Sequence, residues 1–456
     1  MRTILHIDFN SYFARVEQQA NPRLRGKPIG VTGGDRMKRT VVGAASVEAK
    51  KFGVKTGMNL YEARKLCPQL ILVKGDSDKY LSTTKKFLNI LKSYSPYIEL
   101  FSIDEAFIEL PQPKKSSPKL KMSSSNSIGR SIQIPDQARL ALAPAKRVGN
   151  DVIEMAIDIK SQIRAKIGEW ITCSIGISYN KFLAKLAGSL YKPDGLLVIA
   201  DEQAAMRILD QIELNEVCGI GFRIKRRLNN MGIFNFSDLR RVNLEYLLAS
   251  FKSYGQTLYN MSRGLDDSPV SPFYEKEEVK SIGHRHTIDH DADSYEEIKQ
   301  ILLKLSELVA RRMRAKKLVG KTVSLWFRYA FKQTYNPGLS PQFQTGIGFL
   351  GDGAQSTVSF TSDGLEIFKT GWGIFMSLWD EKAIRMIGIS ISNLKPTTPE
   401  NLNLLPEVKV KEVITKALDK INDKFGEFTL QRGVLLNSVK VYRKANPFLA
   451  DRRFKL

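Results

Sequence analysis

The chain has 456 residues, 43% of them hydrophobic, and its 70 lysines and arginines against 47 acidic residues give a net charge of +23. A chain of this length is expected to fold as roughly two to four domains, and so positive a charge favours nucleic acid over a membrane as the partner, because we find neither a basic amphipathic anchor nor a lipidation motif. We also find no secretion signal, no apolar stretch long enough to span a bilayer and no cysteine pattern typical of zinc or disulfides, so we expect a cytoplasmic protein that does not enter membranes.

Residues 1–110 alternate between strand and helix signals, which indicates a mixed α/β layer. The apolar run Thr3–Ile7 is typical of a buried strand, and it ends at Asp8. Apolar residues then recur at helical spacing between Tyr80 and Leu91. Strand-like composition returns over residues 98–110.

Two adjacent acids, Asp104 and Glu105, lie inside this last segment. Neighbouring residues on a flat strand point to opposite faces, so these carboxylates can share a metal site only if the chain turns there. We therefore predict a tight hairpin at the pair. Together with Asp8, the two acids predict a cage for hard divalent cations, in which phosphoryl transfer would take place.

The segment from Pro111 to Gly149 has a different composition, rich in serine, proline and basic residues, with Asp136 as its only acid. It cannot bury enough apolar surface to offset the entropy lost on ordering. We expect a flexible basic insertion, which acts either as a tether for DNA or only as a solvated loop.

After the insertion, Asn150 is predicted to cap a helix whose apolar face includes Ala156 and Ile163. A strand at Ile171–Ser178 follows, and a second helix is expected to open within Tyr179–Ala187.

Residues 217–232 contain the sequence Gly219-Ile-Gly221 between two predicted short helices, followed at once by basic residues that include Arg223 and Lys225. The backbone N–H groups of such a turn can face a phosphate. The pattern predicts a helix-hairpin-helix that contacts the DNA backbone, and a purely structural helix-turn-helix is the alternative.

The region from Val279 to Asn393 is predicted to follow the order strand, helix, strand, strand, helix, strand, which is the ferredoxin-like arrangement. Within it, residues 329–355 are predicted to form a long hairpin loop. The last sixty residues, 397–456, are expected to be a tail with a short amphipathic helix that ends at Gly426.

Five segments of the sequence form recognisable motifs: Asp8–Glu17, Pro22–Pro28, Val47–Val54, Ser102–Ala106 and Gly176–Lys185. Together they resemble the Y-family translesion DNA polymerases, particularly the bacterial DNA polymerase IV type. The resemblance runs from residue 1 to about residue 395 and keeps the family's order of palm, fingers, palm, thumb and little finger. It implies an α/β (α+β) right-hand polymerase with small fingers, a helical thumb that contains the helix-hairpin-helix, and a ferredoxin-like little finger. The implied boundaries are 1–30 and 76–185 for the palm, 31–75 for the fingers, 186–270 for the thumb, 271–278 for a linker, 279–395 for the little finger and 396–456 for the tail.

The resemblance implies a monomeric, low-fidelity, template-directed DNA polymerase that extends primer-template DNA past damaged bases with deoxynucleoside triphosphates. Asp8, Asp104 and Glu105 would hold two Mg²⁺ ions, with the backbone carbonyl of Phe9 as a further ligand. One ion would activate the primer 3′-hydroxyl and the other would neutralise the leaving pyrophosphate.

Phe13, beside Tyr12, falls where the family has a bulky aromatic beneath the incoming sugar, and it would exclude a 2′-hydroxyl. Tyr12 is assigned to the same nucleotide site. The small residues 43–45 lie where the fingers cover the nascent base pair, and they would leave an open site, although small residues are also common in turns.

Lys181 falls at the position assigned to the family's triphosphate-contacting lysine, and Lys50 stands where an arginine is usual. Val47 also replaces a tyrosine that commonly helps to bind the same phosphates. Because lysine lacks the bidentate fork of arginine, nucleotide binding would be weaker or would recruit another cation, for which Arg39 is a candidate.

Asn401–Leu405 resembles, in degenerate form, the peptide by which bacterial polymerases dock on the sliding clamp, and a plain linker is the alternative.

Two other function classes compete with the polymerase interpretation. A noncatalytic Y-family scaffold would lack the acidic ligands, which are all present here. A nucleotidyl cyclase also pairs carboxylates on a ferredoxin-like palm, but it would not explain the Gly-Ile-Gly hairpin or the positive charge.

Overall fold

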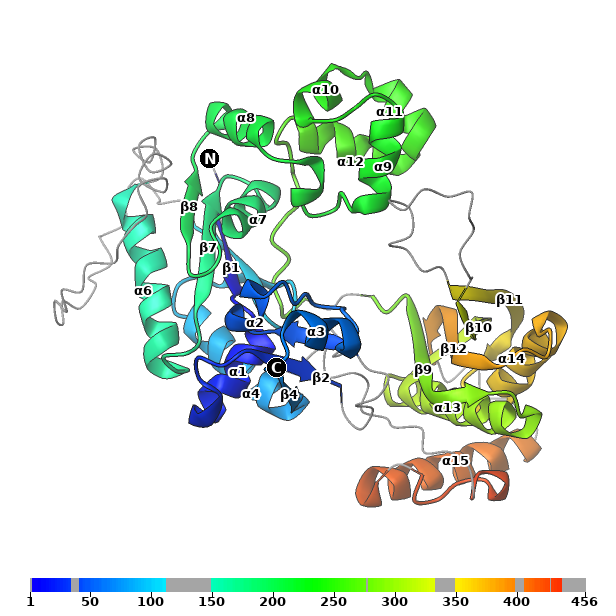
Figure 1. Ribbon diagram of the computed structural model, residues 1–456. Coiled ribbons are helices and arrows are strands. Elements are labelled where there is room, and N and C mark those ends of the chain that lie inside the picture. The colour runs from blue at the N-terminus through cyan, green and yellow to red at the C-terminus, as the bar shows by residue number, and fades with distance from the viewer. Residues whose placement is uncertain are drawn as a thin grey trace. The chain divides into compact units, whose positions relative to one another are not determined.

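The computed structural model describes residues 2–33, 41–111, 149–275, 278–332, 349–397, 406–426 and 428–436. The chain divides into two compact units, and the division falls between Lys276 and Glu277 (Figure 1). Within the described residues, no helix combines the length and apolar character needed to cross a membrane.

The first unit is built on a five-stranded sheet in the order β5-β6-β1-β7-β8. β1 (Thr3–Phe9) runs antiparallel between β6 (Glu105–Leu110) and β7 (Cys173–Ser178). β5 (Tyr97–Leu100) completes a hairpin with β6, and β8 (Leu196–Ile199) pairs in parallel with β7. The strands predicted from the apolar runs are confirmed, and every residue of β7 is buried, including Ser174 and Ser178.

Two helices cover one face of this sheet. α4 (Ser77–Leu91) and α6 (Asn150–Lys166) pack against each other and share a core with Leu5 and Ile7 of β1. The buried face predicted for α6 is confirmed. The predicted cap is wrong: Asn150 is the first helical residue, and Gly149, at φ +66°, precedes it without a side-chain cap.

α7 (Lys181–Leu190) covers the opposite face, packing on β7, β1 and β8. Its cap is Asn180, whose side chain accepts a hydrogen bond from the backbone N–H of Leu183. A Cβ at Gly176 would lie 2.1 Å from the carbonyl oxygen of Ala184, so the glycine allows the helix to approach the strand closely.

A second, three-stranded sheet has the order β3-β2-β4, with β3 antiparallel and β4 parallel to β2. It joins the larger sheet through the α1 helix and encloses a small core of its own. Its elements are α1 (Tyr12–Ala20), η1 (Pro22–Leu24), β2 (Ile29–Thr32), β3 (Val42–Ala45), α2 (Val47–Lys51), α3 (Leu60–Leu66) and β4 (Ile71–Lys74).

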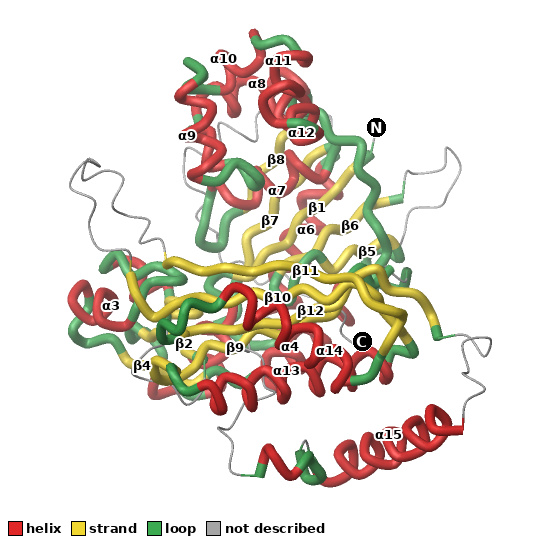
Figure 2. The backbone as a smooth tube through the Cα atoms, turned by 90° about the vertical axis from the view of Figure 1, so that its right-hand side faces the viewer, coloured by secondary structure: helices red, strands yellow, loops and turns green. Residues whose placement is uncertain are grey.

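A helical subdomain follows β8 and packs around Phe236, Leu239 and Leu258 (Figure 2). The Gly219-Ile-Gly221 turn leads into α9 as predicted, but the element before it is only one 3₁₀ turn, η3. The elements are α8 (Glu202–Gln211), η3 (Leu214–Glu216), α9 (Phe222–Asn230), α10 (Phe236–Arg241), α11 (Leu244–Phe251) and α12 (Ser253–Ser262).

The chain from Gly264 to Phe273, which we call the palm strap, returns from this subdomain along the large sheet. The Gly264 carbonyl accepts a hydrogen bond from the Asn180 side chain at 2.8 Å. Val270 is buried against Ile4, and the Phe273 N–H donates to a β5 carbonyl at 2.8 Å. The strap is thus anchored at both ends.

The second unit confirms the predicted order of strands and helices. Its antiparallel sheet has the order β11-β10-β12-β9, so β12 separates β9 from β10, and the first βαβ unit is split. α13 and α14 pack on each other and on the sheet. The elements are β9 (Ser281–Ala292), α13 (Tyr295–Ala315), β10 (Leu318–Lys332), β11 (Phe349–Thr361), α14 (Gly364–Leu378) and β12 (Ile384–Pro396).

The residues expected to form a tail include a helix that is attached to the second unit. α15 (Pro406–Phe425) ends before Gly426 as predicted, but it is 20 residues long rather than short. Arg314 of α13 donates to both carboxylate oxygens of Asp419, at 2.7 and 2.8 Å. After the helix, Leu435 of η6 (Gly433–Leu435) is 1% exposed in the core of this unit.

This packing predicts that residues beyond α15 stabilise the second unit. Leu435→Ala should lower the free energy of unfolding by about 2–5 kcal/mol, because it leaves a cavity in the core. The matched control is Leu436→Ala, since Leu436 is 71% exposed. Urea unfolding of the full chain measures both, and equal effects of the two variants would contradict a core role for Leu435.

Candidate active site

The three acids singled out in the sequence meet at the end of β1. The register of β1 on β6 places Asp8 opposite Glu105. The Phe101 N–H donates to the Glu105 carbonyl at 3.1 Å and closes a tight turn, which confirms the predicted hairpin. The Phe9 N–H donates to the Asp104 carbonyl at 3.0 Å, so this hairpin is tied to the end of β1.

Alternation along β1 decides which side chains face α7. Leu5 and Ile7 enter the core with α4 and α6, whereas Ile4 packs against Ala184 of α7. His6 and Asp8 share the face of Ile4, because successive residues of a strand point to opposite sides. The site therefore forms between the sheet and the helix that follows β7.

Glu105 is held in its ionised form. Burial raises its pKa, but the hydrogen bond from His6 and the charge of Lys185 lower it to about 2. His6 Nε2 lies 2.9 Å from Glu105 Oε2, and the Lys185 ammonium pairs with the same oxygen.

His6 is placed to donate a hydrogen bond to Glu105. Burial lowers its pKa, so the ring is neutral. Its Nδ1 atom is buried and has no partner within the described chain. A metal-bound histidine normally donates its other N–H to an acceptor, and Nδ1 has none here. The proton is therefore placed on Nε2, facing Glu105.

The surroundings of Asp104 favour its protonated form. Burial raises its pKa, the hydrogen bond from Ser102 opposes that change, and the charges of Asp8 and Glu105 raise it further. Oxygens of Asp8 and Glu105 and a nitrogen of His6 lie within 4.8 Å of one another. A divalent cation among these carboxylates would relieve their repulsion, and oxygen donors suit Mg²⁺.

The two aromatic residues proposed to contact the nucleotide differ in position. Tyr12 is 2% exposed and its hydroxyl donates to the Tyr80 carbonyl at 2.7 Å, so its side chain belongs to the core. The assignment of Tyr12 to the nucleotide site stays a prediction. Phe13 is partly exposed, and its ring centroid lies 4.6 Å from that of Tyr80.

Lys181 does not reach the carboxylates. Its ammonium donates to both oxygens of Glu99, at 2.8 and 2.7 Å, and to the Pro269 carbonyl of the palm strap. The triphosphate contact of Lys181 stays a prediction. Another lysine lies beside the carboxylates: Lys192 Nζ is 2.8 Å from Asp8 Oδ1. Sequence reasoning missed Lys192, although Tyr191-Lys-Pro-Asp-Gly195, directly after α7, is a clear turn signal.

Lys50 lies close enough to Lys192 and Asp8 for their charges to affect its pKa. Its pKa is lowered first by desolvation and then by the positive charge of Lys192, while Asp8 acts in the opposite direction. The three groups are therefore electrostatic neighbours. Val47, which replaces the usual tyrosine, begins α2 one turn before Lys50.

The thumb residues keep their predicted arrangement only in part. Gly219 has φ +108°, which favours glycine, and Gly221 is the residue before α9. Arg223 is exposed on the first turn of that helix. Lys225 instead donates to Glu213 and to Asn215, each at 2.7 Å.

Four predictions lie largely or wholly outside the described residues: the Arg39 candidate, nearly all of the 111–149 insertion, residues 333–348 of the predicted hairpin loop, and the clamp-docking peptide Asn401–Leu405. The described ends of that loop belong to strands instead, β10 to Lys332 and β11 from Phe349.

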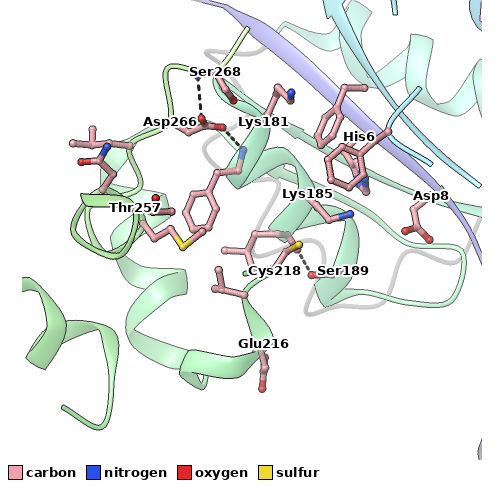
Figure 3. A pocket seen from close by; sticks show the side chains of 18 of the residues that line it. His6, Asp8, Lys181, Lys185, Ser189, Glu216, Cys218, Thr257, Asp266 and Ser268 are labelled. Carbon is pink, nitrogen blue, oxygen red and sulfur yellow. Dashed lines mark hydrogen bonds between the residues drawn. The ribbon is translucent and has the colours of Figure 1, made fainter. Parts of the chain in front are cut away.

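A cavity of about 600 Å³ opens beside the carboxylates (Figure 3). Asp8, His6 and Lys185 line one side and the helical subdomain contributes the other, including Cys218 and Met261. In Figure 3, Lys185 extends toward Asp8, whereas Lys181 lies farther from it. Of the acidic cluster, Asp8 lines this cavity, beside three lysines and the further acids Glu216, Asp266 and Asp267.

Comparisons with known proteins agree with this geometry. Residues 7–189 match the impB/mucB/samB family, residues 279–404 match the C-terminal domain of that family, and residues 215–266 match the thumb domain of DNA polymerase iota. The chain is 34% identical over 444 residues to the DNA polymerase IV of Pelotomaculum thermopropionicum, covering 97% of each chain. It is 32% identical over 443 residues to that of Moorella thermoacetica, covering 96% of this chain and 97% of the other.

A solved Y-family DNA polymerase chimera shares the fold, with a TM-score of 0.63 and 23% identity over 86% of this chain and 98% of the other. This match and the thumb-domain match confirm the predicted right-hand polymerase fold. The chain belongs to the Y family of DNA polymerases, within its DNA polymerase IV branch.

Proposed function

We propose that this translesion DNA polymerase transfers nucleotides at low fidelity by a two-metal mechanism in which Asp8, Asp104 and Glu105 hold two Mg²⁺ ions. The observation that supports the proposal is the register of β1 on β6, which places Asp8 opposite Glu105, while the charges of both reach Asp104. When bound, one ion lowers the pKa of the primer 3′-hydroxyl and the other neutralises the leaving pyrophosphate. The Phe9 carbonyl, at the same strand end, is the proposed further ligand.

The protein's own residues prepare this site. His6 and Lys185 keep Glu105 ionised, so it is ready to accept a cation without first losing a proton. Lys185 and Lys192 balance the acidic charge while no metal is bound. Both ammonium groups become free to meet phosphate oxygens once the carboxylates have cations of their own.

The triphosphate is proposed to bind between Lys192 and Lys50. Both lie beside Asp8, and neither has the guanidinium fork that fixes a phosphate in two places. Lys181 is proposed to secure the palm strap instead, through Glu99 and Pro269.

DNA is proposed to run past the thumb, with phosphates at the Gly219-Ile-Gly221 turn and at Arg223. Lys225 would join them after exchanging its contact with Glu213, which is 67% exposed and therefore weakly held. The proposal also includes an open site above the nascent base pair, where residues 43–45 are small. It further includes the docking of Asn401–Leu405 on a sliding clamp.

The metal cage is tested by Asp104→Asn. Primer extension should fall by roughly a thousandfold or more, because several kcal/mol of charge stabilisation are lost at the reacting phosphate. Affinity for primer-template DNA should be nearly unchanged. The matched control is Glu109→Gln on β6, the strand that begins directly after Asp104; the Glu109 carboxylate pairs with Arg2. Near wild-type extension by Asp104→Asn would refute the cage.

The sugar gate is tested by Phe13→Ala. If the ring lies beneath C2′ of the nucleotide, the preference for deoxyribonucleotides should drop by about 100-fold, because an added hydroxyl no longer meets a steric barrier. A pure packing role predicts a loss of about 3–5 kcal/mol of stability with the sugar preference unchanged. Incorporation efficiencies with both nucleotides, read beside the melting temperature, separate the two roles.

The triphosphate contact is tested by comparing Lys192→Met with Lys181→Met. Lys192→Met should raise the KM for the nucleotide about tenfold or more, because it removes a charge-assisted hydrogen bond. Lys181→Met should lower the melting temperature, since Glu99 loses its partner, and should leave that KM near wild type. The reverse pattern would restore the role first predicted for Lys181.

A further inference from the structure

Lys192 is carried by a tight turn, Tyr191–Gly195, between α7 and β8. The Gly195 N–H donates to Ser174 Oγ at 3.2 Å, and its carbonyl accepts from the Ile175 N–H at 3.0 Å. A Cβ at Gly195 would lie 1.8 Å from the Tyr191 carbonyl oxygen, so only glycine allows this closure. One end of the turn is therefore fixed to the start of β7.

Two cations of α6 hold the middle of the turn at Asp194. Lys160 Nζ donates to the Asp194 carbonyl at 2.5 Å and lies 3.1 Å from Oδ1. Arg164 pairs with Oδ2 of the same side chain. Lys160 and Arg164 are four residues apart, so they share one face of the helix. Together they hold both the backbone and the carboxylate of Asp194, which has φ +59°.

A third contact connects the turn to the catalytic strand. The Asp194 N–H donates to Asn10 Oδ1 at 2.8 Å, and Asn10 is 4% exposed. Asn10 also bonds Ser174 through its amide nitrogen at 3.0 Å. Because Asn10 follows Asp8 by two residues, the turn that carries Lys192 is fastened to the strand end that carries its partner.

We propose that Lys160 and Arg164 are positioning residues for the incoming triphosphate, acting through Asp194 to hold Lys192. This inference rests on the proposed contact between Lys192 and the triphosphate. A lysine side chain loses considerable rotamer entropy when it binds, and a fixed backbone limits the further loss. Neither cation has a described contact with Asp8 or Lys192, so their effect passes through the turn.

The experiment measures nucleotide KM and kcat by primer extension for Lys160→Met and Arg164→Met. Each should raise KM about tenfold and change kcat by less than about threefold, with DNA affinity unchanged. Lys166→Met is the control, because it removes one charge from the last turn of α6 and has no hydrogen bond or ion pair within the described chain. Unchanged KM in both test variants would overturn the inference.

A double-mutant cycle separates positioning from general damage. In the Lys192→Met background, Arg164→Met should raise KM no further, because the group that it positions is already gone. An undiminished tenfold rise there would overturn the inference. Arg164→Lys keeps the charge, so its KM should be close to the wild-type value. That result would show that the effect of Arg164→Met is not caused by poor folding.

The same double-mutant cycle distinguishes failure of the positioning role from failure of the proposed contact between Lys192 and the triphosphate. If Lys192→Met alone leaves KM unchanged, the triphosphate role of Lys192 fails, and the positioning role fails with it. If Lys192→Met raises KM but Lys160→Met and Arg164→Met do not, only the positioning role fails.

Discussion

Repulsion among three carboxylates at one strand end is the constraint on which the site depends. Asp8 and Glu105 face each other across β1 and β6, and Asp104 is forced beside them by the hairpin. Burial raises the pKa of Asp104, and the charges of Asp8 and Glu105 raise it further, so the cluster needs positive charge nearby. Lys185 and Lys192 supply that charge from a single helix and the turn after it. The packing of α7 on the sheet therefore places the two cations that balance the charge of the carboxylates.

The sequence was informative where one local pattern decides the structure. The apolar run before Asp8 predicted β1, and the adjacent acids predicted the hairpin, because two neighbouring carboxylates cannot share a site on a flat strand. The order of elements in the second unit followed in the same way. The order of its strands did not, since pairing between distant segments leaves no local signal.

Side-chain roles were predictable only where the neighbours could be named in advance. Lys181 and Lys192 are the same residue type eleven positions apart, and tertiary contacts alone assign one to Glu99 and the other to Asp8. Tyr12 and Phe13 are adjacent aromatics, yet Tyr12 is buried, with its hydroxyl bonded to the Tyr80 carbonyl, whereas Phe13 is partly exposed. Similarly, nothing in the local pattern around Leu435 showed that it would pack in a core with α13, which ends more than a hundred residues earlier.

The palm strap sets how far the two units can act independently. Its last hydrogen bond to the large sheet is made by the Phe273 N–H, and Val279 already packs against the core of the second unit, so residues 274–278 connect the two. An extended chain spans at most about 3.5 Å per residue, so the six steps from Phe273 to Val279 span at most roughly 21 Å. If both units bind one duplex, as proposed, so short a connection corresponds to an effective concentration in the millimolar range for the second binding event. A unit released from the duplex would then rebind while the other is still bound, and the length of this connection would influence processivity.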